Sequence, residues 1–282
     1  MEAQYDKLSG SYIEDNYYGH RERFAVSGGV VKKISTVDNM KEIRREIRDV
    51  LSPLEFKNTL EVGVGELTTL EDIYKFKGID LDCYGIDLSL NRLSHGLEEF
   101  EKRHNSLPRV AKANATKLPF PSDSFDLVYT RHTLEQIPDK YSDALDEIVR
   151  VSRRYIVLFE PSFELGSFPQ KLKMLNSDYV RGLRKYFTNK KDVCLKKAYL
   201  MQNSANPLNH TACYVLEVNK SVEKRMEGTV PFLCPKSLCE LENFGSFLFS
   251  SGSNSAYPII NNIPVLDEKY SVRLNKLLVN KR

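Results

Sequence analysis

The stretch TLEVGVGEL at residues 59–67 decides the fold that this sequence predicts. An apolar run reaches the acid Glu61, and two glycines follow in G-x-G spacing, Gly63 and Gly65, before a polar segment begins. A buried strand ends in this way when the backbone turns sharply and a ligand approaches it closely, because a Cβ atom would clash with the turn or the ligand. A G-x-G pair alone is common, and a tight strand-to-helix turn without a ligand explains it equally well.

A second strand that ends in an acid favours the ligand-binding interpretation. The run LDCYGID at residues 81–87 ends in Asp87. A doubly wound α/β sheet places a ribose-binding acid about 20 residues beyond the glycines. Asp87 could instead cap the helix that follows, but Ser89 is an equally good N-cap residue, which leaves Asp87 available for a ligand.

A third group of motifs completes an ordered set. It consists of ANATKLPF at residues 113–120, FDLVYT at 125–130 and RHTLEQIP at 131–138. Over residues 55–161 the chain resembles the class I S-adenosylmethionine-dependent methyltransferases of the type 11-like group. Their pattern is a glycine loop, an acidic strand end, D-A-x-x-L-P-F, F-D-x-V and H-x-L-E-H. The resemblance implies an α/β fold with a Rossmann-like, doubly wound, mostly parallel sheet, and S-adenosyl-L-methionine as the cofactor.

The resemblance also implies cofactor contacts at the first two strand ends. Glu61 and Gly63 are expected near the amino-acid part of the cofactor, and Gly65 is expected to allow close backbone approach. Asp87 is expected to hold the ribose hydroxyls, and Leu88 to flank the adenine.

The next two strand ends are expected to meet the adenine edge and the methyl group. Asn114, which replaces the usual Asp of the family, and Ala115 are assigned to the adenine edge. Thr130, Arg131 and His132 are expected to face the methyl group. His132 is the best candidate for a general base, because the ordinary pKa of histidine lies near working pH. A histidine that only packs or positions is the alternative, since many relatives need no base.

Bulk composition excludes several classes of protein. The chain has 282 residues, 41% hydrophobic and 28% charged residues, and a formal net charge of only +3, which gives no global nucleic-acid signature. No apolar run approaches a membrane span, and the N-terminus does not resemble a signal peptide. The five scattered cysteines do not suggest a disulfide framework, so a reducing cytoplasm and no membrane partner are expected.

Two segments outside the motifs carry further expectations. Residues 1–35 show no strong strand pattern and, by the resemblance, are expected to cap the cofactor or substrate. Residues 163–200 form a basic insertion, and between 170 and 200 nine basic residues face two acidic ones. This charge indicates either a solvated face or a basic lid for an anionic substrate, phosphorylated or nucleic acid.

The tail divides the chain into two predicted domains, residues 1–225 and 226–282. Residues 230–270 resemble the small zinc-ribbon-like domain of the tRNA-methyltransferase activator family, whose pattern is L-x-C-P-x-C, a hairpin, and Y-P-I-x-x-x-I-P-x-L. Cys234 and Cys239 lack the second cysteine pair that a tetrahedral zinc site needs, so no metal is expected.

The resemblance implies transfer of a methyl group to an O or N acceptor of a small molecule or glycan precursor, with an anionic substrate as one partner. An RNA methyltransferase acting on rRNA or tRNA, and an inactive cofactor-binding scaffold, are the alternatives. A nicotinamide oxidoreductase is less favoured, because Thr68 stands where the third glycine of G-x-G-x-x-G would be. The sequence predicts no oligomeric state.

Overall fold

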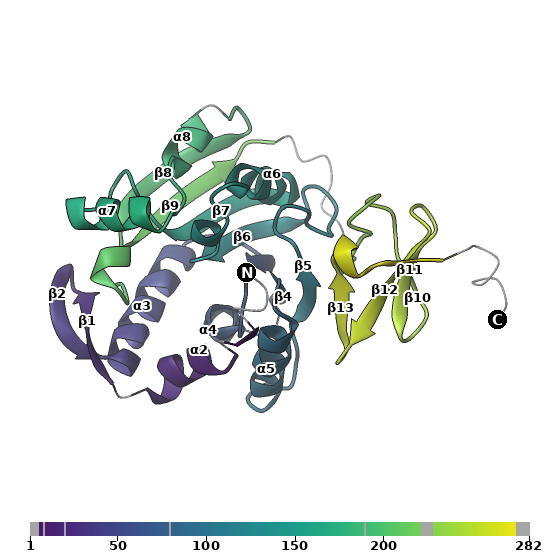
Figure 1. Cartoon of the computed structure of the whole chain (residues 1–282), viewed down its shortest axis with the longest axis horizontal. Coiled ribbons are helices and arrows are strands. Elements are labelled where there is room, and N and C mark those ends of the chain that lie inside the picture. Colours follow the sequence, from purple (N-terminus) through teal and green to yellow (C-terminus); the bar gives the residue numbers. More distant parts are fainter. Residues whose placement is uncertain are drawn as a thin grey trace.

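The central feature of the computed structural model is a twisted α/β sheet (Figure 1). The structure describes residues 6–7, 9–19, 21–78, 80–188, 190–220 and 228–274. Five parallel strands form the middle of the sheet: β3 (Asn58–Val62), β4 (Asp82–Asp87), β5 (Arg109–Ala113), β6 (Phe125–Arg131) and β7 (Ser152–Pro161). Two antiparallel strands continue it beyond β7: β9 (Thr211–Val218), then β8 (Val193–Leu200).

The strand order β5-β4-β3-β6-β7-β9-β8 confirms the Rossmann-like, doubly wound sheet that the motifs predict. The chain runs outward from β3 to β5 and then returns to β6 on the other side of β3. Ligands bind outside the carboxyl ends of the strands where such a reversal occurs. The ends of β3 and β6 therefore mark the expected site.

Helices cover both faces of the sheet because the strand residues alternate between two apolar clusters. Leu60 and Val128 pack with α6, whereas Leu127 and Tyr129 pack with helices on the opposite face. The helices on that opposite face are α3 (Thr36–Leu51), α4 (Thr68–Lys77) and α5 (Leu90–Glu101). On the first face lie α6 (Tyr141–Val151) and the short α8 (Leu183–Thr188), and α7 (Phe168–Asn176) follows β7.

The N-terminal segment contains a hairpin that the sequence pattern did not reveal. After α2 (Ser11–Ile13) and the π-helix η1 (Glu14–Tyr18), β1 (Glu22–Ser27) pairs antiparallel with β2 (Val30–Ser35). The turn uses Gly28 and Gly29 at φ 64° and 78°, the left-handed values that a tight hairpin requires. Both strands carry many polar residues, so the sequence shows no clear alternation of apolar and polar residues that would predict a strand.

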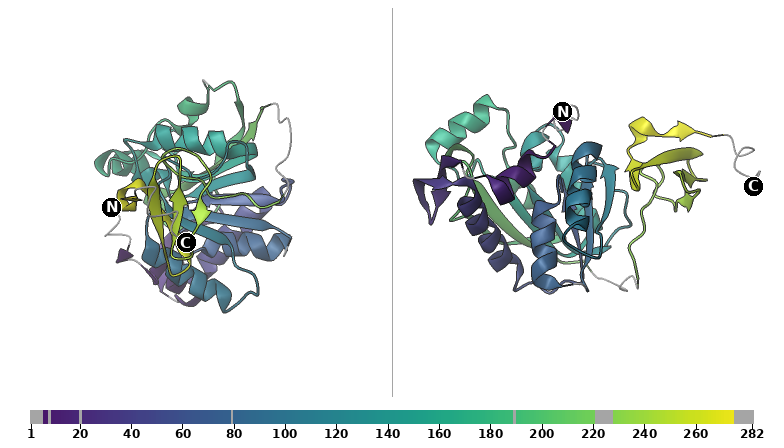
Figure 2. Two further views of the ribbon diagram at one scale, coloured as in Figure 1. Left: turned by 90° about the vertical axis from the view of Figure 1, so that its right-hand side faces the viewer. Right: turned by 90° about the horizontal axis from the view of Figure 1, so that it is seen from below.

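The C-terminal strands join the main sheet. They are β10 (Glu242–Asn243), β11 (Phe247–Ser250), β12 (Ser255–Ile260), β13 (Ile263–Leu266) and β14 (Val272–Arg273), with η4 (Glu268–Tyr270) before the last. β13 pairs parallel with β5, so these strands cover one edge of the sheet, as the two views of Figure 2 show. The predicted boundary at residues 225 and 226 lies outside the described residues.

Two kinds of feature are absent from the described residues. No helix among them is long and apolar enough to cross a membrane. No group of three or more His, Cys, Asp or Glu side chains in this part of the chain is placed to hold a metal ion. The resemblance of the tail to the activator family remains a prediction.

Candidate active site

A cavity of about 400 Å³ opens at the carboxyl ends of β3 and β6. Its walls come from parts of the chain that are far apart in sequence. The end of β3, the β3–α4 connection and the start of α4 form one side, and the β6 loop forms another. The N-terminal segment, α3, α5 and the loop after β8 contribute the other lining residues. Among the lining residues are Ser11, Arg23, Met40, Glu61, Gly63, Thr68, Arg92, Arg131, His132, Glu135, Asn206 and Asn209.

The two glycines of the G-x-G pair are required by the loop itself. Gly63 and Gly65 have φ values of 79° and 54°. A Cβ atom on Gly63 would lie 2.1 Å from Thr133 Oγ1, and one on Gly65 would lie 2.2 Å from Arg92 Nη2. The tight-turn interpretation therefore holds for both positions, while Gly63 also lines the cavity.

Asp87 braces the same loop. Its Oδ2 accepts a hydrogen bond from the Gly65 N–H at 2.9 Å, and its Oδ1 accepts one from the Ser89 N–H at 2.8 Å. The Ser89 side chain accepts from the Arg92 N–H and caps α5, as the sequence predicted. Each Asp87 oxygen keeps a second acceptor position, which suits a pair of vicinal hydroxyls.

The predicted contact residues fall into three groups in the structure. Glu61, Gly63 and His132 line the cavity. Gly65, Asp87, Leu88, Asn114 and Ala115 do not line it and follow the neighbouring ends of β3, β4 and β5. Thr130 is buried behind the wall, where its hydroxyl donates to Glu160 at 2.7 Å.

Glu61 is a buried acid at the base of the cavity. The Tyr129 hydroxyl donates to its Oε2 at 2.7 Å. Burial raises the pKa of Glu61 to about 8, although the Tyr129 hydrogen bond and the Arg131 charge oppose the shift. Glu61 is therefore mostly protonated at neutral pH, and a cation placed beside it would favour loss of that proton.

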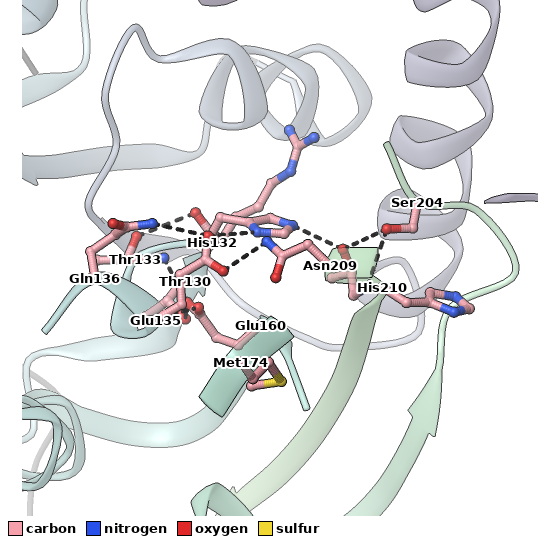
Figure 3. Close-up of polar contacts among 12 residues, drawn as sticks. Thr130, His132, Thr133, Glu135, Gln136, Glu160, Met174, Ser204, Asn209 and His210 are labelled. Atoms are coloured by element: carbon pink, nitrogen blue, oxygen red, sulfur yellow. Dashed lines mark hydrogen bonds and ion pairs between the residues drawn. The ribbon is translucent and has the colours of Figure 1, made fainter. Parts of the chain in front are cut away.

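His132 lies in a hydrogen-bonded group that closes one side of the cavity (Figure 3). Its Nδ1 is 3.0 Å from Glu135 Oε1, and its Nε2 is 2.8 Å from Thr211 Oγ1 at the start of β9. Asn209, on the short helix η3 (Pro207–Asn209), donates from Nδ2 to the other Glu135 oxygen at 2.8 Å. Both ring nitrogens of His132 thus have partners.

The charges around His132 favour its protonated form. Burial alone lowers the pKa of His132, but the Glu135 charge and hydrogen bond outweigh this and raise it. Burial raises the pKa of Glu135, yet the paired imidazole lowers it overall. Burial also raises the pKa of Glu160, which accepts from the Thr133 N–H beneath the pair. The group is best described as an imidazolium–carboxylate pair, and the general-base role of His132 remains a prediction.

The N-terminal segment is fastened over the cavity by Glu66. The two Glu66 oxygens accept hydrogen bonds from the N–H groups of Gly10 and Ile13, each at 2.9 Å. Ser11, between these residues, and Arg23 on β1 line the cavity. That this segment caps the cofactor or substrate remains a prediction; Tyr17 lies outside the lining and donates to Glu71.

Sequence reasoning missed several residues of the cavity wall. Arg131 is not among them, because the motif loop placed it with Thr130 and His132; its Nη1 donates to Thr69 Oγ1 at 3.0 Å. Arg23, Asn206 and Asn209 come from the hairpin and the β8–β9 connection. No local pattern marks them, because only the packing of distant segments brings them to the cavity.

The known proteins with similar sequences are methyltransferases. Residues 60–156 match the family model described as a methyltransferase domain. Phosphoethanolamine N-methyltransferase 3 of Arabidopsis thaliana is 31% identical over 134 residues, 48% of this chain and 24% of that protein. The demethylmenaquinone methyltransferase of Geobacillus kaustophilus is 29% identical over 110 residues, 39% of this chain and 47% of that protein. The chain thus spans about a quarter of the plant relative and about half of the bacterial one.

Solved structures agree on the fold. The magnesium protoporphyrin IX methyltransferase of Synechocystis PCC 6803, with bound S-adenosylhomocysteine, superposes with a TM-score of 0.55 at 12% identity, covering 77% of this chain and 98% of that one. An N-methyltransferase of Bradyrhizobium japonicum WM9 gives 0.51 at 14% identity, covering 64% and 88%. The fold of this chain is thus that of these methyltransferases, and residues 60–156, which hold the motifs, match the methyltransferase domain model.

Replacing Gly63 by alanine tests the requirement for glycine in the loop. Gly28→Ala, with φ 64° and nothing within 4 Å of the added Cβ, is the matched control and should cost about 1–2 kcal/mol from backbone strain. Gly63→Ala should cost about 1–3 kcal/mol more, because the new atom meets Thr133. Urea unfolding measures both; equal losses would show that Thr133 moves aside freely.

Proposed function

We propose that this chain is an S-adenosyl-L-methionine-dependent methyltransferase that methylates an O or N acceptor of a small molecule or glycan precursor. The observation that carries the proposal is the meeting of Glu61, Gly63 and the His132 loop around one cavity of a methyltransferase core. The names of the relatives, which concern phosphoethanolamine and demethylmenaquinone, support a small-molecule acceptor.

The residues present fit the cofactor. Glu61 and Gly63 would hold its amino-acid end, and Asp87 would accept from the ribose hydroxyls with the lone pairs that its backbone contacts leave. The adenine would lie beside Leu88, Asn114 and Ala115, which are partly exposed. The cofactor supplies an already activated methyl group, so the protein has to provide alignment and a water-poor pocket.

The part of the cavity wall that would contact the methyl acceptor contains cationic side chains and one amide side chain. Arg23 and Arg131 give it positive charge, which favours an acceptor that carries an anionic group, whereas the charge of His132 is balanced by Glu135. Asn209 Oδ1 is buried and has no hydrogen-bond partner among the described residues. We assign it as a candidate acceptor for a hydroxyl or amine of the substrate. Glu135 would then hold His132 in position from the opposite side.

RNA is the second class of acceptor. The basic insertion at residues 163–200 supports it, because phosphate contacts dominate the affinity of proteins for nucleic acids. The names of the relatives favour the small molecule.

Isothermal titration tests the cofactor assignment directly. S-adenosyl-L-methionine and S-adenosylhomocysteine should bind with micromolar Kd, and NAD should not bind. Asp87→Ala should weaken both adenosyl ligands at least about tenfold, because it removes charged acceptors from the ribose and the glycine loop. Asp82→Ala, at the exposed start of the same strand, is the control. If neither S-adenosyl-L-methionine nor S-adenosylhomocysteine binds, the proposal is contradicted.

The raised pKa of Glu61 predicts that cofactor binding releases a proton. The cationic amino group of the cofactor favours ionised Glu61, so affinity should rise with pH from about 6 to about 8, by up to about tenfold per unit. Titration at pH 7 in buffers of different ionisation enthalpy measures the released proton. Glu61→Gln should abolish both effects, and an unchanged pH dependence in this variant would assign the proton to another group.

The Glu135 contact predicts a measurable shift in the titration of His132. By NMR, the His132 ring should titrate above its ordinary pKa of about 6.5, because the carboxylate stabilises the charged ring. In Glu135→Gln the pKa should fall, so that neutral imidazole appears at lower pH. The His132→Asn spectrum assigns the signal. Titration at or below the ordinary value in the unmodified chain would refute the paired arrangement.

A further inference from the structure

Helix α7 presents an apolar stripe to solvent. Phe168, Leu172 and Leu175 are 73%, 52% and 48% exposed, and their i, i+4, i+7 spacing places them on one side of the helix. Gln170 and Met174 are buried on the other side. The helix is therefore anchored by its inner face and offers a second apolar face that no described residue covers.

The stripe continues onto two neighbouring elements. Phe24, Val30 and Val31 of the β1–β2 hairpin are 68%, 59% and 60% exposed, and Leu208 of η3 is 48% exposed. The helix η3 contacts both α7 and β1. Figure 1 shows α7 and the hairpin on the same flank, at the opposite end from the C-terminal strands. Along β2 side chains alternate between the two faces of the hairpin, and the pairing of Phe24 with Lys33 puts Val31 on the face of Phe24. We call this surface the apolar rim; its members are Phe24, Val31, Phe168, Leu172, Leu175 and Leu208.

The apolar rim borders the candidate active site. Phe24 follows Arg23, and Leu208 precedes Asn209; both of these neighbours line the cavity. The bridge between Val26 and Ser204 holds the hairpin against the loop that leads to η3. A surface that contacts the rim would therefore lie close to the cavity.

Positive charge accompanies the apolar rim. Lys171 and Lys173 are partly exposed on either side of the α7 stripe, and the exposed Lys32 and Lys33 follow Val31. Lys33 is ion-paired with Glu22 at 2.9 Å, so Lys32, Lys171 and Lys173 are the lysines on which the charge argument rests. Exposed apolar side chains flanked by lysines are the pattern of elements that bind an anionic membrane interface.

We infer that the apolar rim docks on an anionic lipid surface. Its apolar side chains would enter the headgroup region, and the surrounding lysines would contact lipid phosphates. If the proposed function holds, this orientation brings the cavity to the bilayer and suits an acceptor that carries a lipid tail. A second copy of the chain fits less well, because a symmetric contact would bring like-charged lysine clusters together.

Vesicle flotation with the full chain, without cofactor, tests the docking. The chain should float with vesicles of phosphatidylcholine and phosphatidylglycerol, much less with phosphatidylcholine alone, and less at high salt. The variant Phe168→Ser/Leu172→Ser/Leu175→Ser should bind at least about tenfold less. The matched control Leu107→Ser/Ile260→Ser/Val272→Ser removes three exposed apolar side chains (47%, 42% and 58%) elsewhere and should float like the unmodified chain.

Three outcomes would overturn the inference: no flotation with anionic vesicles at low salt, equal flotation of the α7 variant, or a dimer in ultracentrifugation that the α7 variant dissociates. Circular dichroism confirms that both variants fold. Because the assay contains no cofactor, its result is independent of the titrations with S-adenosyl-L-methionine. Loss of cofactor binding with intact flotation would reject the proposed function alone.

Discussion

The Asp87 carboxylate holds together the loops on which the rest of the site depends. Its two oxygens accept from the N–H of Gly65, after β3, and of Ser89, before α5. Hydrogen bonds to a carboxylate are stronger than those between neutral groups, so this side chain fixes the two loops to each other in a buried position. The strand end that the sequence marks for a ligand is thus also the brace of the glycine loop.

Two further carboxylates accept hydrogen bonds from the backbone of distant parts of the chain in the same way. Glu66 accepts from the backbone of the N-terminal segment, and Glu46 on α3 accepts from the N–H groups of Gln202 and Asn203 at 2.7 and 2.9 Å. The walls of the cavity are irregular segments whose backbone groups need partners. Buried or half-buried acids supply those partners and so determine the shape of the cavity.

The arrangement separates two kinds of surface at opposite ends of the sheet. β13 pairs with β5 and covers an edge that would otherwise expose unpaired backbone groups. The other end carries the hairpin, α7 and η3 beside the cavity, with apolar side chains in contact with solvent. One end thus completes the sheet, and the other offers a surface for an external contact.

The sequence by itself determined the parallel core and the ends of its strands. Apolar runs, the glycine pair and the caps are local signals, so Glu61, Gly63, Gly65 and Asp87 could be placed at strand ends, while their expected cofactor contacts came from the resemblance. The antiparallel hairpin at residues 22–35 was not predicted, because its strands are largely polar and one of its faces is exposed.

Only the tertiary structure decided which distant residues complete the site. The partners of His132 are Glu135 nearby and Thr211 on β9, and Arg23 reaches the cavity from the hairpin. The pairing of β13 with β5 likewise joins segments about 150 residues apart. Such contacts depend on how separate elements pack, and the residues that make them carry no pattern in their own neighbourhood of the chain.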